Sequence, residues 1–278
     1  TAVERMGNSL KYASKVLRND QEIVEIALKA QIDCEKEDNC LQYISNELKN
    51  NRKFFLEAVR NRGNRMEFAS EELKDDKDFV MKAISSRCSY CFEHISDRLK
   101  NDEDVVLKAV SRSQYLSEHM SEELKNDKIF YMKVLNINGY HLENASPKLK
   151  NDEDVVLLAV THFGRALEFA SDDLKDNKKI VLKSLEKDTH TKNCGVVCSP
   201  LSFASERLKY DEEVVIKALE HVGERDIHES DLLRYTSEII RGKFNIVMKA
   251  VKVSGYNLDY ASEELKRNKE IVLAAIDQ

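Results

Sequence analysis

The chain has 278 residues, of which 42% are hydrophobic and 34% are charged, and it contains only two prolines and eight glycines. This composition is typical of a helical protein and excludes a disordered chain or a sandwich of short strands. The formal net charge of −6 excludes a global positive field that would attract nucleic acid or anionic lipid. No apolar run approaches the roughly 20 residues of a membrane span, so we expect none.

One motif recurs along the chain: an apolar residue, any residue, an aromatic residue, Ala, Ser, any two residues and Leu-Lys. Most of the intervals between successive motif serines are close to one length, about 25 residues. A fixed period of this length indicates a stacked repeat array, in which each repeat buries its apolar face against its neighbours. The serine is taken as position 0 of each repeat, and the ten serines are Ser14, Ser45, Ser70, Ser96, Ser121, Ser146, Ser171, Ser205, Ser237 and Ser262.

Each repeat is expected to contain the same elements in the same order. A short helix ends near the serine, which caps a turn carrying Leu at +3 and a basic residue at +4. A second helix of about three turns follows, with apolar residues at +9, +10, +13 and +14 facing the neighbouring layers. Asn or Asp at +5 and +6 is predicted to cap this helix, and Gly at +18, as in Gly139 and Gly255, to end it in a left-handed conformation.

In chain order, a long interval separates Ser14 from Ser45, and regular repeats follow as far as Ser171. The next two intervals, which end at Ser205 and Ser237, are also long and are interpreted as insertions, after which the last repeat reaches Gln278. The pattern predicts an all-α helical-repeat solenoid of about ten 25-residue helix-turn-helix units, with residues 1–278 forming one continuous, elongated array. Because a polar terminal cap is missing at the C-terminal end, we expect a piece of a longer protein.

The segments Phe68-Ala69-Ser70-Glu71-Glu72-Leu73-Lys74 and Asp152-Glu153-Asp154-Val155-Val156-Leu157-Leu158-Ala159-Val160 resemble the repeat known as domain of unknown function 4116. The resemblance covers nearly the whole chain. It implies a helical repeat found in arrays in protists and host-associated bacteria. It implies no established activity, and it provides no catalytic residues to carry over.

The insertion between Ser171 and Ser205 contains His190, Cys194 and Cys198, which could supply three zinc ligands. A fourth ligand is missing and the spacing is unusual, so a solvated loop is favoured over a disulfide or a zinc site. His190, Lys192 and Asn193 are candidate binding residues in this loop, since insertions in a solenoid often carry recognition.

The cysteines are few for a disulfide-built scaffold, so reduced thiols and a reducing, cytosolic-type environment are favoured. Delivery of a secreted effector into a host cell remains an alternative, and the compartment stays unknown. Cys88 and Cys91 have a redox-motif spacing, but the repeat pattern already explains both residues.

Position +4 is basic in every repeat, and stacking would align these residues along one edge. This edge is a candidate binding surface for an acidic peptide, nucleic-acid phosphates or anionic lipid. The competing interpretation is structural, because lysine at a helix end interacts with the last carbonyls and the flanking acids neutralise the row. Acids on the long helices, such as Asp104 and Glu213, are expected to pair within their helix with Lys108 and Lys217. The candidate edge residues are Lys74, Lys100, Lys125, Lys150, Lys175 and Lys209.

No catalytic triad, Cys-His pair or carboxylate pair stands apart from a repeated structural position, so no catalytic, cofactor-binding or metal-binding residue is predicted. We expect a non-enzymatic scaffold that mediates protein-protein interaction, with a protein or peptide of unknown identity as partner. Nucleic acid is disfavoured as a partner, because the recurrent aromatic at −2 is expected in the core rather than exposed. The alternatives are an RNA-binding repeat array and a targeting or regulatory segment of a larger secreted effector.

Overall fold

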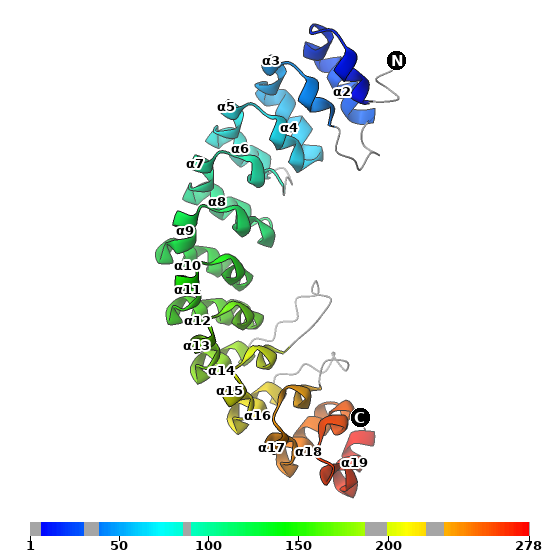
Figure 1. Cartoon of the computed structure of the whole chain (residues 1–278), viewed down its shortest axis with the longest axis vertical. Coiled ribbons are helices and arrows are strands. Elements are labelled where there is room, and N and C mark those ends of the chain that lie inside the picture. Colours follow the sequence, from blue (N-terminus) through cyan, green and yellow to red (C-terminus); the bar gives the residue numbers. More distant parts are fainter. Residues whose placement is uncertain (1–6, 31–38, 86–89, 187–198, 221–230, 278) are drawn as a thin grey trace. The chain divides into compact units, whose positions relative to one another are not determined.

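The computed structural model describes residues 7–30, 39–85, 90–186, 199–220 and 231–277. It divides into two compact units, Thr1–Leu124 and Lys125–Gln278, which are described separately below. All regular elements within the described ranges are helices (Figure 1), so the prediction of an all-α repeat solenoid is confirmed. The prediction of one continuous array over residues 1–278 stays a prediction.

Each repeat consists of a 3₁₀ helix before the serine, a one-turn helix after it, and a longer α helix of 8 to 10 residues. The long helices are therefore somewhat shorter than predicted. They are α2 (Gln21–Ala30), α4 (Arg52–Asn61), α6 (Lys77–Ser85), α8 (Glu103–Val110), α10 (Lys128–Ile137), α12 (Glu153–His162), α14 (Lys178–Glu186), α16 (Glu212–Glu220), α18 (Phe244–Val253) and α19 (Lys269–Ile276).

The shorter elements connect these helices. The one-turn α helices are α3 (Asn46–Lys49), α5 (Glu71–Lys74), α7 (Asp97–Lys100), α9 (Glu122–Asn126), α11 (Pro147–Lys150), α13 (Asp172–Lys175), α15 (Glu206–Lys209) and α17 (Glu238–Arg241). In the first and last repeats the 3₁₀ helices η2 (Leu17–Asn19) and η12 (Leu265–Arg267) take this place. The 3₁₀ helices before the serines are η1 (Gly7–Tyr12), η3 (Cys40–Tyr43), η4 (Gly63–Phe68), η5 (Phe92–His94), η6 (Gln114–His119), η7 (Gly139–Asn144), η8 (Gly164–Phe169), η9 (Pro200–Phe203), η10 (Leu232–Tyr235) and η11 (Gly255–Tyr260).

Within each unit the long helices of successive repeats lie side by side, as α10, α12 and α14 do (Figure 1). Their apolar positions +9, +10, +13 and +14 form the core between layers. In α12 the residues at these positions are Val155, Val156, Ala159 and Val160, and none of them has any exposed surface. Helix α12 also packs against η7 and η8, so each long helix is covered by its neighbours and by the 3₁₀ helices.

Each motif serine caps the short turn that follows it. The Ser70 Oγ accepts a hydrogen bond of 3.2 Å from the backbone N–H of Leu73, and the same bond from position +3 to the serine is present in all ten repeats. Pro147 occupies the first helical position after Ser146, where the missing N–H is not needed. The predicted capping role of the serines is confirmed.

The same serines also join each repeat to the preceding one. The Ser171 backbone N–H donates to the carbonyl of Lys150, 2.9 Å away. Each motif serine from Ser45 to Ser205 forms the equivalent bond with the residue at +4 of the preceding repeat. The Ser171 Oγ donates to the Asn151 Oδ1, 2.5 Å away, as Ser70 does to Asn50 at 2.6 Å. Hence the residue at +5 connects two repeats.

The structure thus corrects the predicted caps of the long helices. Position +6 alone provides the cap: the Asp152 carboxylate accepts from the backbone N–H groups of Asp154 and Val155. Position +5 does not cap, because its side chain already accepts from the serine of the next repeat. A pattern seen within one repeat gives no information on a bond to the neighbouring one.

The glycines at +18 have a different role from the one predicted. Neither Gly139 nor Gly255 has a left-handed φ angle. A Cβ atom on Gly139 of η7 would lie 2.1 Å from the carbonyl oxygen of Ala159 in α12, and one on Gly255 of η11 would lie 2.3 Å from that of Ala275 in α19. Glycine is needed at these positions because the 3₁₀ helix approaches the next long helix too closely for any side chain.

We expect Gly139→Ala to destabilise the protein by about 1 to 3 kcal/mol, because the rigid carbonyl of Ala159 must move to admit the methyl group. Gly242→Ala is the control, since its new Cβ would meet its nearest atoms at 3.6 Å and φ is −91°. This control should be neutral or stabilising by up to about 1 kcal/mol. Urea unfolding of both variants provides the comparison, and equal losses would contradict the close-approach explanation.

Two repeats carry Asp instead of Asn at +5, and each of these carboxylates binds an arginine as well as a serine. Hydrogen bonds from the Ser96 hydroxyl and the Arg98 guanidinium lower the pKa of Asp75. Hydrogen bonds from Ser205 and Arg207 lower the pKa of Asp176 in the same way. At three of the repeats with Asn, the +2 residue of the next repeat is Glu instead: Asn19 donates to Glu47 at 2.8 Å, Asn50 to Glu72 at 2.6 Å and Asn101 to Glu123 at 2.8 Å.

A carboxyl group whose pKa is lower in the folded chain stabilises the fold above its unfolded pKa of about 3.9 and loses this contribution as the pH falls. We expect the double variant Asp75→Asn/Asp176→Asn to show a shallower decline in the free energy of unfolding than wild type between about pH 4 and pH 2. Asparagine retains the oxygen that accepts from the serine.

Urea titrations at a series of acidic pH values measure these declines. Asp173→Asn is the control, because the exposed Asp173 carboxylate has no hydrogen-bond partner among the described residues. A double variant that declines as steeply as wild type would show that the two joints do not contribute to acid sensitivity.

Candidate functional site

The candidate binding edge lies where the short helices meet the 3₁₀ helices of the next repeat. The bond from a motif serine to the carbonyl at +4 of the preceding repeat brings the basic residue at +4 beside the residue at −2. Arg241, for example, lies over the ring of Tyr260 at 5.9 Å. We call this surface the Lys-aromatic face. It consists of each basic residue at +4 and the residue at −2 of the next repeat: Arg18 and Tyr43, Lys49 and Phe68, Lys74 and His94, and Lys100 and His119 in the first unit, and Lys150 and Phe169, Lys175 and Phe203, and Arg241 and Tyr260 in the second.

The expectation that the aromatics at −2 belong to the core is wrong. Phe68, Phe169 and Phe203 are half-exposed, and so are the histidines and tyrosines at the same position from Tyr43 to Tyr260. The buried face of this short helix is set by two other positions. Positions −4 and −1, such as Leu167 and Ala170, share the buried face, and position −2 is turned away from it.

The basic residues at +4 are half-buried and mostly paired. At least five of them bind the acid three residues earlier, as Lys74 binds Glu71 at 2.8 Å and Lys209 binds Glu206 at 2.9 Å. Arg18 and Arg241 instead donate to backbone carbonyls. The other lysines with this pair are Lys100, Lys175 and Lys266.

Lys49 and Lys150 differ from these five. The residue three positions earlier is Asn46 in one case and Pro147 in the other, so neither lysine has the usual acid. Neither forms an ion pair with a described residue. Burial lowers the pKa of Lys150; the carboxylate of Glu143 opposes this effect, and the positive charge of Lys175 adds to it.

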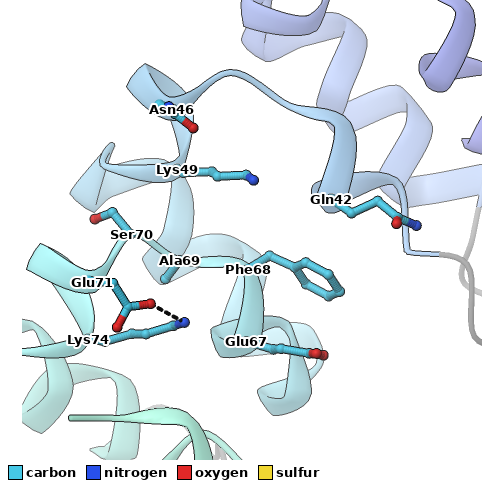
Figure 2. A pocket seen from close by; sticks show the side chains of 9 residues that line it. All are labelled: Gln42, Asn46, Lys49, Glu67, Phe68, Ala69, Ser70, Glu71 and Lys74. Atoms are coloured by element: carbon cyan, nitrogen blue, oxygen red, sulfur yellow. Dashed lines mark hydrogen bonds and ion pairs between the residues drawn. The ribbon is translucent and has the colours of Figure 1, made fainter.

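A pocket of about 440 Å³ opens between α3 and α5 beside Lys49 (Figure 2). Lys49, Lys74 and the ring of Phe68 extend to the same side of the backbone, and the Lys74 ammonium is held by Glu71. The pocket therefore combines an apolar ring, several hydrogen-bonding groups and one cation that has no ion-pair partner in the part of the chain that the structure describes. Its lining residues are Gln42, Asn46, Lys49, Glu67, Phe68, Ala69, Ser70, Glu71 and Lys74.

A second row of charges, which the sequence analysis missed, connects the N-terminal ends of the long helices. Lys77 at +7 binds Asp102 and Asp104 of the next repeat, each at 2.8 Å. The Lys77 ammonium donates hydrogen bonds to both carboxylates, and these bonds raise its pKa, the one to Asp102 more than the one to Asp104. The same arrangement recurs at Lys128 with Asp152 and Asp154, and at Lys178 with Asp211 and Glu213.

This row corrects the expected pairs within single helices. Asp104 and Glu213 bind Lys77 and Lys178 of the preceding repeat in place of Lys108 and Lys217. The alternation of Lys and acid at +7 from Ser70 to Ser205 was the available signal. These charges are used in joining repeats and are not offered to a ligand.

The candidate loop residues His190, Lys192 and Asn193 lie outside the described residues, as do Cys34, Cys88, Cys194 and Cys198. Cys91 takes part in a disulfide bond, so the expectation of reduced thiols is wrong for this residue. Burial raises the pKa of the Cys40 thiol to about 11, although the nearby Arg65 lowers it, and this thiol is therefore unreactive.

The described residues also restrict the kind of site that this part of the chain can form. No group of three or more His, Cys, Asp or Glu residues there is placed to hold a metal ion. Among the helices that the structure describes, none has both the length and the apolar character needed for a membrane span.

Comparison with known proteins identifies a repeat family. No curated protein and no solved structure matches the chain. The model of a family described as Domain of unknown function (DUF4116) matches residues 1–34, 33–74, 51–100, 76–125, 102–150, 127–168, 152–191 and 244–278. The successive matches that begin between positions 51 and 152 follow the spacing of the motif serines. Since the matches cover more than half of the sequence, the chain belongs to the DUF4116 family of helical repeats.

Proposed function

We propose that the chain is a non-enzymatic scaffold that binds a segment of another protein on the Lys-aromatic face. The observation that supports this proposal most is the pocket beside Phe68, where an exposed aromatic ring lies between two lysines. Aromatic side chains, Phe included, are enriched in the buried cores of protein interfaces. A stacked array presents such groups at regular intervals to an extended partner.

The charges of the face favour a protein over a nucleic acid. Most of its lysines already bind an acid of their own turn, and Glu67 and Glu71 line the pocket itself. A nucleic acid carries a negative charge on every nucleotide and would meet these carboxylates along its whole length. A peptide can place its acids only opposite the lysines that are not already paired.

RNA binding remains the second candidate, and one observation favours it. The rings at −2 are half-exposed and lie beside basic residues, an arrangement on which single-stranded bases stack. The proposal and this candidate predict different ligands and different responses to salt. RNA affinity falls steeply as salt rises, because phosphate binding releases counterions.

The proposal predicts that the full chain enriches specific sequences from a phage library of random peptides. Binding of the enriched peptides should weaken by about tenfold or more in Phe68→Ser/Phe169→Ser, because the variant removes two apolar anchors from the face. Ile129→Ser is the control, since Ile129 is 77% exposed and lies on the long helix α10. Fluorescence anisotropy with synthetic copies of the peptides measures both effects.

Absence of any enriched peptide would contradict the proposal. So would equal losses in the face variant and the control. A random-sequence RNA that binds at physiological salt and is lost in the face variant would favour the second candidate instead.

A further inference from the structure

Resting on the proposed function, we infer that the pocket between α3 and α5 is the specificity site of the Lys-aromatic face. In this pocket Lys49 binds an acidic side chain of the partner, and Phe68 receives the apolar side chain next to it. The partner segment is therefore an extended peptide with Asp or Glu beside an apolar residue.

The other repeats of the chain show what Lys49 lacks. In Lys74 and Lys209 the ammonium binds a carboxylate of the same turn, supplied by the residue at +1. In the repeat of Lys49 this residue is Asn46, whose side chain has no charge. Lys49 is half-buried in the same way as the paired lysines, so its ammonium faces the pocket without the carboxylate that its position normally provides. A carboxylate from a partner fits this place by charge and by position.

The surroundings of Lys49 argue for a peptide in preference to a polyanion. The neighbouring cation, Lys74, is neutralised by Glu71, and Glu67 of η4 adds a negative charge to the lining. The pocket thus has room for one negative charge beside Lys49 and disfavours a second one nearby. Its volume of about 440 Å³ admits one or two side chains, and the ring of Phe68 favours an apolar neighbour for the acid.

The second unit contains a related arrangement with one informative difference. Lys150 also lacks an acid at +1, and Phe169 and the paired Lys175 occupy the places of Phe68 and Lys74. However, Glu143 faces Lys150 where Gln42 lies near Lys49, and its charge acts on Lys150. A partner carboxylate would be repelled by Glu143, so the pocket of Lys49 is the stronger site.

The test closes the pocket without altering Lys49 or Phe68. Asn46→Glu restores the acid that the paired repeats carry three residues before the lysine. The probe is the peptide most enriched by the wild-type chain from a phage library of random ten-residue peptides. We expect Asp or Glu beside an apolar residue in the enriched set, and about tenfold weaker binding of the probe by Asn46→Glu, measured by fluorescence anisotropy.

Two further variants make the result specific. Lys49→Gln should weaken the probe to the same extent as Asn46→Glu. Lys53→Gln, on the exposed side of α4 and outside the Lys-aromatic face, should change its affinity less than about twofold. Thermal melting checks that each variant is folded. Asn46→Glu should melt no lower than wild type, since it adds an ion pair of the kind found at Lys74.

The outcomes separate this inference from the proposed function. Peptides that bind the wild-type chain but respond equally to Asn46→Glu and Lys53→Gln would overturn the inference and leave the scaffold proposal standing. Enrichment without acidic residues would do the same. A chain that enriches no peptide would overturn both, and a random-sequence RNA oligonucleotide that binds and is lost in Asn46→Glu would replace the peptide with a nucleic acid.

Discussion

The fold depends on one repeated hydrogen-bond arrangement at the motif serine. Its hydroxyl accepts from the turn that it begins and donates to the Asn or Asp at +5 of the preceding repeat, while its backbone N–H binds the carbonyl at +4. A single residue thereby fixes the start of a helix and its distance from the previous one. Apolar burial stabilises each layer, but it is not directional, and the serine sets the register of one layer on the next.

The serine arrangement explains which features could be predicted from one repeat. The cap at +3 and the core positions +9, +10, +13 and +14 are local, and their spacing in the sequence predicts them correctly. The role of Asn151 and the pairing of Asp104 with Lys77 each involve a partner in a neighbouring repeat. Such contacts depend on the register between layers, which the spacing within one repeat does not contain.

The candidate site was predicted in part for the same reason. The basic residue at +4 was visible as a pattern, and so were the acids that neutralise most of it. The aromatic at −2 was misplaced because its neighbour at −1 is buried, whereas position −2 lies about one third of a turn from that buried face and Phe68 is half-exposed. Lys49 differs from the paired lysines because Asn46 replaces the acid at +1. The sequence shows this substitution, but it does not show that the acid at +1 binds the lysine in the other repeats.

The residue at +7 alternates between Lys and Glu in the repeats from Ser70 to Ser205, so neighbouring layers carry opposite charges at this position. Lys128 binds acids of the next repeat, whereas Glu153, the corresponding residue of that repeat, is the acid that binds Lys179. Odd and even layers are therefore complementary rather than equivalent. Removal of the repeat of Ser146 alone would bring Lys128 opposite Asn177 and Lys179, so two lysines would face each other without an acid. Removal of the repeats of Ser146 and Ser171 together would instead bring Lys128 opposite Asp211 and Glu213, which are acids. Over the repeats from Ser70 to Ser205, the charges at these joints therefore match again after a change of two layers but not after a change of one.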